Sequence, residues 1–195
     1  MYEMEIKIKI HNRQQVLKQL DKLGATKLLR LQQTDSYYNA PKSLKDFEET
    51  DESLRIRTTE EYNPTESKKH TVKHDITYKG AKLDTKVKAR IEHICYIQDP
   101  EAMDQILKAL EFRKVVTLIK DRQVFTLTFQ EKKLEILLDQ IEGLEGNYLE
   151  AEIMAESSIE QKQAKEILLK FIKNLGYMAN DSILQSYLEL YLKKH

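Results

Sequence analysis

Charged and apolar residues alternate strictly at the start of this chain, in residues 1–10. Every second residue from Glu3 to Lys9 is charged, and each residue between them is apolar. Successive side chains of a β-strand point to opposite faces of its sheet. The pattern therefore predicts a strand with one charged face and one apolar face.

The same alternation returns along the chain and predicts further strands. We expect them at about 27–38, 53–59, 75–79, 85–96, 114–120, 122–129, 133–141 and 147–155. Residues 60–74 are polar and lack a period, so they are predicted to form an exposed hairpin loop.

Four helices are predicted between and after these strands. Asn12 can cap the first, Asp99 and Pro100 open the second, and Ser157 or Ser158 caps the third. The last is expected at about 182–193. Each carries a stripe of apolar residues, so it needs an apolar sheet face to pack on. The fold class is therefore α+β, with the charged strand faces turned away from the helices.

Those charged faces carry both signs of charge. The basic positions are Lys7, Lys9, Arg55, Arg57, Lys79, Lys88, Arg90, Lys120 and Arg122. The acidic positions are Glu3, Glu5, Glu92, Glu135, Asp139, Glu150 and Glu152. They face either open water or a closed lumen, and about eight strands suffice to close a barrel. Buried cations need partners, and carboxylates suit Mg²⁺ or Mn²⁺. A closed lumen would thus be a polyphosphate site with divalent metal.

Composition narrows the class of protein. The 195 residues fit one domain, 1–195, and their charges balance at net zero, which argues against a general nucleic-acid or anionic-membrane surface. The single cysteine excludes an internal disulfide and fits a reducing compartment. With no apolar run near ~18 residues and no signal peptide, we expect a cytoplasmic protein.

The sequence lacks the motifs of several other classes of nucleotide-binding protein and enzyme. The chain has no G-x-x-x-x-G-K-[ST], no G-x-G-x-x-G and no G-x-S-x-G. His70 and His74 stand four residues apart, but no third zinc ligand lies near them in the sequence. Side chains rather than a glycine-rich loop must therefore hold any phosphate.

Short motifs in order along nearly the whole chain resemble the CYTH superfamily, the triphosphate tunnel metalloenzymes. They begin with Glu3-x-Glu5-x-Lys7 and end with Ser186-Tyr187-Leu188-Glu189. Between these lie Gln33-x-Asp35-x-Tyr37, Leu54-Arg55-Ile56-Arg57, Thr77-Tyr78-Lys79-Gly80, Arg90-x-Glu92, Lys120-x-Arg122, Leu138-Asp139, Gly143-Leu144-Glu145-Gly146 and Glu150-x-Glu152. The resemblance implies a closed, eight-stranded antiparallel β-barrel with helices packed outside.

The resemblance also implies roles for individual residues. The metal ligands would be Glu3, Glu5, Asp139, Glu150 and Glu152. The triphosphate would be bound by Lys7, Arg55, Arg57, Lys79, Lys120 and Arg122, with Arg90 joining them and Lys9 and Lys88 on the same charged faces. Lys7, Lys120 and Arg122 are the expected catalytic residues, and the cofactor is Mg²⁺ or Mn²⁺.

The pattern is most similar to the class IV adenylyl cyclase branch. Asp35 fits the cyclase and thiamine-triphosphatase branches better than the tripolyphosphatases, and the chain has no tryptophan to stack on thiamine. We therefore expect conversion of ATP to 3′,5′-cyclic AMP and pyrophosphate. The alternatives are an inorganic or thiamine triphosphatase and a non-catalytic triphosphate or nucleotide binding module. The expected partner is the triphosphate alone, with no nucleic acid or membrane, and a homodimer stays open.

Overall fold

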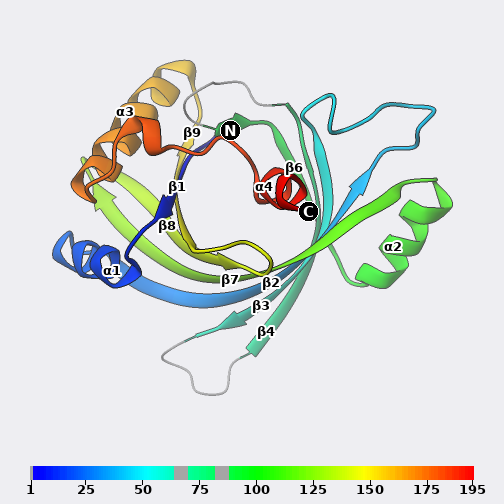
Figure 1. The fold of residues 1–195 in the computed structure, drawn as a ribbon, viewed down its shortest axis with the longest axis horizontal. Helices are drawn as coiled ribbons and strands as arrows, with labels where there is room; N and C mark the ends of the chain where they lie inside the picture. Colours follow the sequence, from blue (N-terminus) through cyan, green and yellow to red (C-terminus); the bar gives the residue numbers. More distant parts are fainter. Residues whose placement is uncertain (1, 64–69, 82–87) are drawn as a thin grey trace.

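The computed structural model describes residues 2–63, 70–81 and 88–195 (Figure 1). In these ranges the strands are β1 (Tyr2–Ile10), β2 (Thr26–Asn39), β3 (Ser53–Tyr62), β4 (His70–Lys79), β5 (Lys88–Arg90), β6 (Glu92–Ile97), β7 (Arg113–Phe129), β8 (Lys132–Ile141) and β9 (Asn147–Ala155). The helices are α1 (Arg13–Lys22), α2 (Pro100–Ala109), α3 (Ser158–Asn174) and α4 (Tyr187–Lys194), with a short 3₁₀ helix at Ala179–Asp181.

The strands form one antiparallel sheet that curls into a ring (Figure 1). Their order is β5-β1-β9-β8-β7-β2-β3-β4-β6. The two ends of this order, β5 and β6, are separated along the chain by Ile91 alone. They are thus the two halves of one interrupted strand, which pairs with β1 on one side and with β4 on the other. Counted in this way, eight strands close the barrel, as the family resemblance implies.

Two of the predicted interruptions between strands are not found as predicted in the structure. Residue 121 does not separate two strands, because β7 runs unbroken through it and Asp121 pairs with Gln32 on one side and Gln140 on the other. The predicted loop at 60–74 is wrong at both ends, since β3 continues to Tyr62 and β4 starts at His70, and its middle lies outside the described residues. Regular ladder hydrogen bonds stabilise these polar segments without a buried apolar face.

Helix caps follow the sequence closely. The side chains of Asn12, Asp99 and Ser157 each accept a backbone N–H in the first turn of their helices. The last helix begins at residue 187 rather than 182. Ser182 instead forms a bridge to β1, and a reciprocal capping box of Ser186 with residue 189 sets the start of α4.

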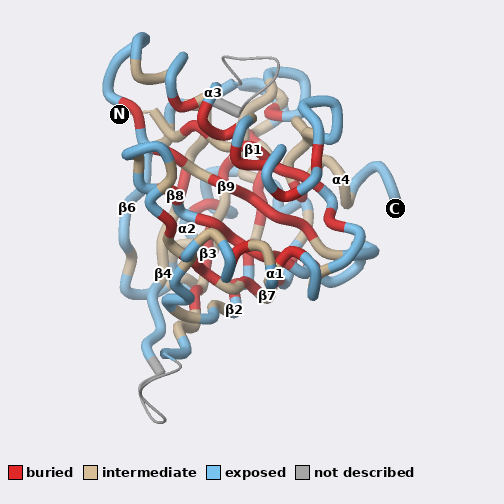
Figure 2. Tube along the Cα trace, turned by 90° about the vertical axis from the view of Figure 1, so that its left-hand side faces the viewer, coloured by how far each residue is buried: buried red, intermediate tan, exposed pale blue. Residues whose placement is uncertain are grey.

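The apolar side of the barrel is its outer side. Helices α1 and α3 cover β1, β8 and β9. The cluster between these layers includes Ile6, Leu134, Ile136 and Phe171, all almost inaccessible to solvent. In Figure 2 the buried segments accordingly concentrate in the strands.

Helix α2 covers a different part of the outer side. It packs on β3 and β7 through a second apolar cluster that includes Leu107, Leu54 and Phe47. Burying the apolar faces against helices on the outside leaves the charged faces inside the ring.

Helix α4 lies at one end of the barrel, inside the outline of the ring in Figure 1. It contributes Tyr187 to a third apolar cluster with Tyr37, Leu118 and Tyr148, which come from β2, β7 and β9. The backbone N–H of Ile183, just before the helix, donates to the carbonyl oxygen of residue 7 at 2.7 Å. The segment leading into α4 is therefore tied to β1, and the helix covers that end of the lumen.

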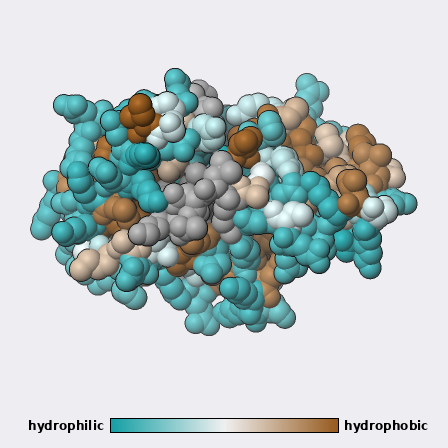
Figure 3. Space-filling model, turned by 90° about the horizontal axis from the view of Figure 1, so that it is seen from above, coloured by the Kyte–Doolittle hydropathy of each residue, from teal (hydrophilic) through white to brown (hydrophobic). Residues whose placement is uncertain are grey.

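The outer surface is mostly polar. Hydrophilic residues predominate on the face shown in Figure 3, and hydrophobic residues occupy smaller, separate areas of it. In the described ranges, none of the helices is both long and apolar enough to cross a membrane.

Candidate active site

A cavity of about 230 Å³ lies inside the barrel, and we call it the central cavity. Its lining comes from strands on all sides of the ring and from the start of α4. The lining residues are Glu3, Glu5, Lys7, Tyr37, Ser53, Arg55, Arg57, Lys79, Arg90, Glu92, Ile94, Lys120, Arg122, Glu150, Glu152, Ser186 and Tyr187. Seven of these side chains are basic and five are acidic, so the cavity suits a ligand that combines an anion with a cation.

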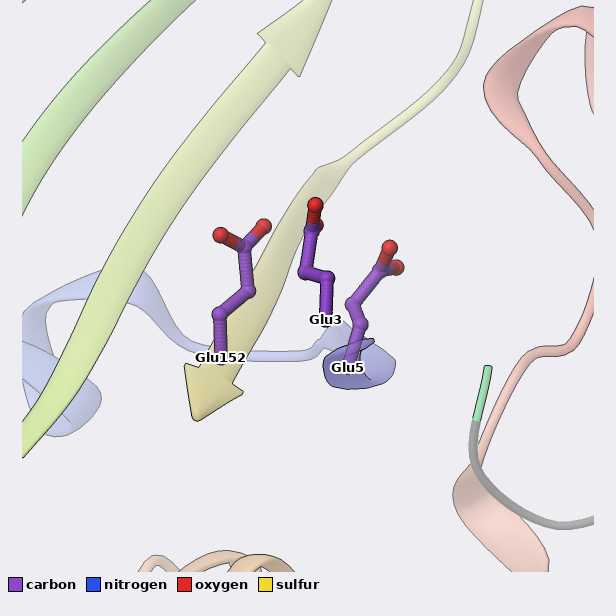
Figure 4. A group of neighbouring side chains, drawn as sticks. All are labelled: Glu3, Glu5 and Glu152. Carbon is purple, nitrogen blue, oxygen red and sulfur yellow. The ribbon is translucent and has the colours of Figure 1, made fainter. Parts of the chain in front are cut away.

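Three carboxylates gather on one wall of this cavity. Glu3 and Glu5 extend from β1 and Glu152 from the adjacent β9, and all three point to the same side (Figure 4). One oxygen atom from each lies within 4.8 Å of the others. Burial raises the pKa of Glu3 to about 7, and the neighbouring carboxylates of Glu92 and Glu5 reinforce the shift against the opposing charge of Lys79. Burial and the Glu3 carboxylate likewise raise the pKa of Glu152.

The chemistry of these carboxylates fits a divalent cation. Like charges held close together in a partly buried site are stabilised by a cation between them. Carboxylate oxygens are the ligands that Mg²⁺ and Mn²⁺ prefer. Within the described ranges, Glu3, Glu5 and Glu152 are thus the residues best placed to hold a metal ion.

Lys7 is the most deeply buried cation of the cavity, with a relative exposure of 1%. Its Nζ lies 3.0 Å from a carboxylate oxygen of Glu150 and 3.8 Å from one of Glu5. It also donates a hydrogen bond of 3.2 Å to the carbonyl oxygen of Gln185. These contacts compensate the cost of burying the ammonium group and fix its position beside the acidic wall.

Arg122 is held by a forked pair of hydrogen bonds. Its Nε and Nη2 donate to the two carboxylate oxygens of Asp139 at 2.7 and 2.6 Å, and it also contacts Glu150. Burial opposes the charge of Arg122, but the carboxylates of Asp139 and Glu150 outweigh it and raise the arginine pKa. Asp139 therefore lies behind Arg122 and orients its guanidinium group toward the cavity.

A second forked pair comes from β2 and β3. Arg57 donates from Nε and Nη2 to the two oxygens of Asp35 at 2.5 and 2.6 Å. Burial works to raise the pKa of Asp35, but the charges of Arg57 and Arg55 outweigh it and hold that pKa well below its ordinary value. Asp35 thus stays ionised and positions both arginines.

Arg55 retains an unsatisfied donor. Its Nη1 lies 3.9 Å from Asp35, whereas its buried Nε has no hydrogen-bond partner among the described residues. A buried donor without an acceptor costs free energy. Because Arg55 lines the central cavity, an anionic oxygen bound there would supply the acceptor.

Lys120 is a buried cation between other cations. Burial, and then the positive charges of Arg122 and Arg57, lower the pKa of Lys120 to about 7. A bound anion would reverse this effect, because an opposite charge nearby favours the protonated amine. The free cavity therefore holds excess positive potential on this wall.

Tyr187 connects α4 to the charged groups. Its hydroxyl donates to Asp139 at 2.8 Å, and the Nζ of Lys7 lies 3.8 Å from the centre of its ring. The sequence motif at 186–189 included Tyr187 but gave it no role. The capping box of Ser186 and Glu189 is the sequence signal that places it in the first turn of a helix.

The structure brings most of the predicted site residues together. Those that line the central cavity are Glu3, Glu5, Lys7, Arg55, Arg57, Lys79, Arg90, Lys120, Arg122, Glu150 and Glu152. Lys9 is exposed and does not line it, and Asp139 contacts Arg122 and Tyr187 instead of the three-carboxylate cluster. Lys88 faces Glu5 in the strand register, but its side chain lies outside the described part. Asp35 and Glu92, which pairs with Lys79, belong to the site although the sequence pattern predicts no site role for them.

The comparisons with known proteins agree with this architecture. The family model of the CYTH domain matches residues 1–187. A protein of Methanocaldococcus jannaschii named "Putative adenylate cyclase MJ0240" is 36% identical over 190 residues, which cover 97% of this chain and 98% of that protein. The chain belongs to the CYTH family.

Solved structures share the fold over nearly the full length. The PH1819 protein of Pyrococcus horikoshii OT3 superimposes with a TM-score of 0.83 at 29% identity, covering 99% of both chains. HpAC1 of Hippeastrum, reported to reveal a dominant triphosphatase activity, has a TM-score of 0.65 at 17% identity and covers 98% of this chain and 95% of its own. At 17% identity, the similarity to HpAC1 shows a common fold.

Proposed function

We propose that this protein is a metal-dependent adenylyl cyclase that converts ATP to 3′,5′-cyclic AMP and pyrophosphate. The observation that carries the proposal is the division of charge in the central cavity, where a cluster of carboxylates faces a larger set of cations. The 36% identity to the M. jannaschii protein supports the choice of reaction.

The basic residues would hold the triphosphate. Arg55 and Arg57 offer forked donors to phosphate oxygens from one wall, and Arg122 and Lys120 offer donors from another. Carboxylate partners already fix the guanidinium groups of Arg57 and Arg122, so little reorganisation accompanies binding. Held in this way, the phosphate chain has one orientation in the lumen.

The acidic residues would hold the cofactor. Glu3, Glu5 and Glu152 would bind Mg²⁺ or Mn²⁺, which neutralises phosphate oxygens and lowers the pKa of an attacking hydroxyl group. In the cyclase reaction the ribose 3′-oxygen would form a bond to the α-phosphorus and lose its proton to solvent water. The bond from that phosphorus to the bridging oxygen breaks, and Lys120 and Arg122 stabilise the departing pyrophosphate.

A triphosphatase is the second candidate, because the same cavity could place water rather than a ribose hydroxyl against a phosphorus atom. The triphosphatase activity reported for HpAC1, which shares this fold, supports this second candidate. A product assay separates the two. Incubation with ATP and Mg²⁺ or Mn²⁺ should give cyclic AMP and pyrophosphate in equal amounts, whereas orthophosphate without cyclic nucleotide would identify a triphosphatase.

Binding alone can be tested first. Tripolyphosphate or ATP at a hundred times its Kd should add roughly 2.7 kcal/mol to stability and raise the melting temperature. Stabilisation without any product would identify a binding module instead of an enzyme. The absence of any shift at millimolar triphosphate would contradict the proposed site itself.

A further inference from the structure

Lys120 differs from the other buried cations of the central cavity in its partners. Arg57 and Arg122 each form a forked pair with a carboxylate, and the Nζ of Lys7 lies 3.0 Å from Glu150. In the part of the chain that the structure describes, the ammonium group of Lys120 forms neither an ion pair nor a hydrogen bond. The charge of Lys120 is therefore left for an anion in the cavity.

Charged groups of both signs surround Lys120 without pairing with it. They are Arg122 of the same strand, Arg57 of β3, Asp35 of β2 and Asp139 of β8. From α4, the ring of Tyr187 lies with its centre 5.5 Å from the Nζ atom. The two carboxylates are already bonded to the two arginines. A charged lysine has three N–H donors, so it needs an acceptor other than these carboxylates.

Gln33 is a buried amide at the same level of the barrel. It is 5% exposed, and the interactions described so far give it no role. In the register of the sheet, Gln33 lies opposite Lys120 on one side and opposite Thr59 on the other. Residues opposite each other in an antiparallel pair share a face, with Cβ atoms roughly 5 Å apart. Because Lys120 lines the central cavity, Gln33 lies beside it on the inner face.

The amide oxygen of Gln33 lacks a donor. Its Nε2 donates to the hydroxyl of Thr59 at 3.4 Å, whereas its buried Oε1 has no hydrogen-bond partner among the described residues. A buried acceptor without a donor costs free energy, which an apolar side chain would not. Beside an ammonium group, which only donates, the oxygen is the complementary atom of the amide.

We propose that Gln33 is a positioning residue for Lys120, and that its amide oxygen accepts a hydrogen bond from the ammonium group when a triphosphate is bound. This inference rests on the proposed function. One N–H of Lys120 is then held by Gln33, and the others donate to phosphate oxygens. Because the amide is neutral, it orients the ammonium group without neutralising it, whereas a carboxylate in its place would compete with the anion.

Gln33→Met tests this role by calorimetry with tripolyphosphate in EDTA. Methionine is of similar length but offers no comparable acceptor. At about pH 6 the Kd should rise about tenfold, because a hydrogen bond to a charged group is lost. The urea midpoint of the free protein should not fall, since the variant removes a buried acceptor that has no donor. Gln32→Met is the matched control at an exposed position of the same strand, and it should change neither quantity.

The dependence on Lys120 separates positioning from a merely structural role. In a Lys120→Met background, Gln33→Met should change the Kd by less than about twofold, because no ammonium group remains to be held. Gln33→Glu is the reciprocal variant and replaces Gln33→Met if that variant does not fold. Its carboxylate would pair with Lys120 and keep it charged, so binding at about pH 8 should no longer take up a proton there.

The remaining outcomes overturn the inference. An equal rise of the Kd with and without Lys120, or a lower urea midpoint in Gln33→Met, would assign Gln33 a structural role. An unchanged Kd in Gln33→Met, or unchanged proton uptake in Gln33→Glu, would exclude the contact with Lys120 while leaving the central cavity as a triphosphate site. No binding of tripolyphosphate by the unaltered protein would overturn the proposed function as well.

Discussion

Lys120 should make triphosphate binding depend on pH. Its pKa is lowered to about 7 in the free protein by burial and by the charges of Arg122 and Arg57. A bound triphosphate favours the charged amine, so the pKa of Lys120 is higher in the complex than in the free protein. The affinity is therefore full below pH 7 and falls as the pH rises through 7 toward the pKa of the complex.

The size of the effect follows from the fraction of protein that carries the proton. With a pKa of about 7, roughly nine tenths of Lys120 is charged at about pH 6 and roughly one tenth at about pH 8. Binding to the charged form alone therefore weakens about tenfold between these two values. At about pH 8 the complex takes up nearly one proton at this residue.

Calorimetry with tripolyphosphate in EDTA measures both the affinity and the number of protons taken up on binding. Titrations in two buffers of different ionisation enthalpy count the protons, and titrations at the two pH values give the affinities. Lys120→Met should lose this proton uptake and the matching change of about tenfold. The ligand's own titration is the same for both proteins, so it cancels in the difference.

Lys114→Met is the matched control, since Lys114 is an exposed lysine of the same strand. It should bind tripolyphosphate with the pH dependence of the unaltered protein. If Lys120→Met keeps that pH dependence and takes up the same number of protons, Lys120 does not contact the triphosphate and the reasoning fails.

Three further substitutions test the site. Glu5→Gln should abolish metal-dependent turnover while retaining tripolyphosphate binding in EDTA, because it removes a hard ligand and no cation; near-normal turnover would make Glu5 a scaffold residue. Asp139→Asn should lower the free energy of unfolding by about 3 kcal/mol, because the buried Arg122 loses its forked carboxylate partner and keeps only Glu150; an unchanged urea midpoint would contradict this. Tyr187→Phe should reduce turnover more than the control Tyr148→Phe, because the Tyr187 hydroxyl donates to Asp139 whereas Tyr148 contributes an edge-on ring contact. Equal turnover in the two variants would show that the Tyr187 hydroxyl has no role in the site.

The local patterns of the sequence determined the elements and the side of the sheet that each residue faces. Alternation with period two placed Lys7, Arg57 and Glu150 on the charged faces of their strands, and the caps at Asn12 and Asp99 fixed two helix starts. These features depend on neighbours within a few residues, so they can be predicted without tertiary contacts. The apolar faces also indicated on which side the helices pack, and they left the charged faces toward either open water or a closed lumen.

The local pattern predicts where the strands lie in the sequence but not how they pair. The strand at 85–96 was predicted as one element, and only pairing with both β1 and β4 shows that its two described halves close the barrel. The sequence pattern predicts two strands, at 114–120 and 122–129, where the structure has the continuous strand β7. The ladder partners of Asp121 on both sides hold it in the strand.

Only the tertiary structure decided which charges meet. Lys7 and Lys9 are equivalent in the alternation, yet Lys7 is buried beside Glu150 and Lys9 is exposed. The period of a strand fixes the face of a residue but not its depth along the barrel, which depends on the register of neighbouring strands. Tyr187 reaches Asp139 from a helix that is 48 residues away in sequence, and no local pattern encodes that contact. The site therefore depends on how the barrel closes and on the helix that covers its end.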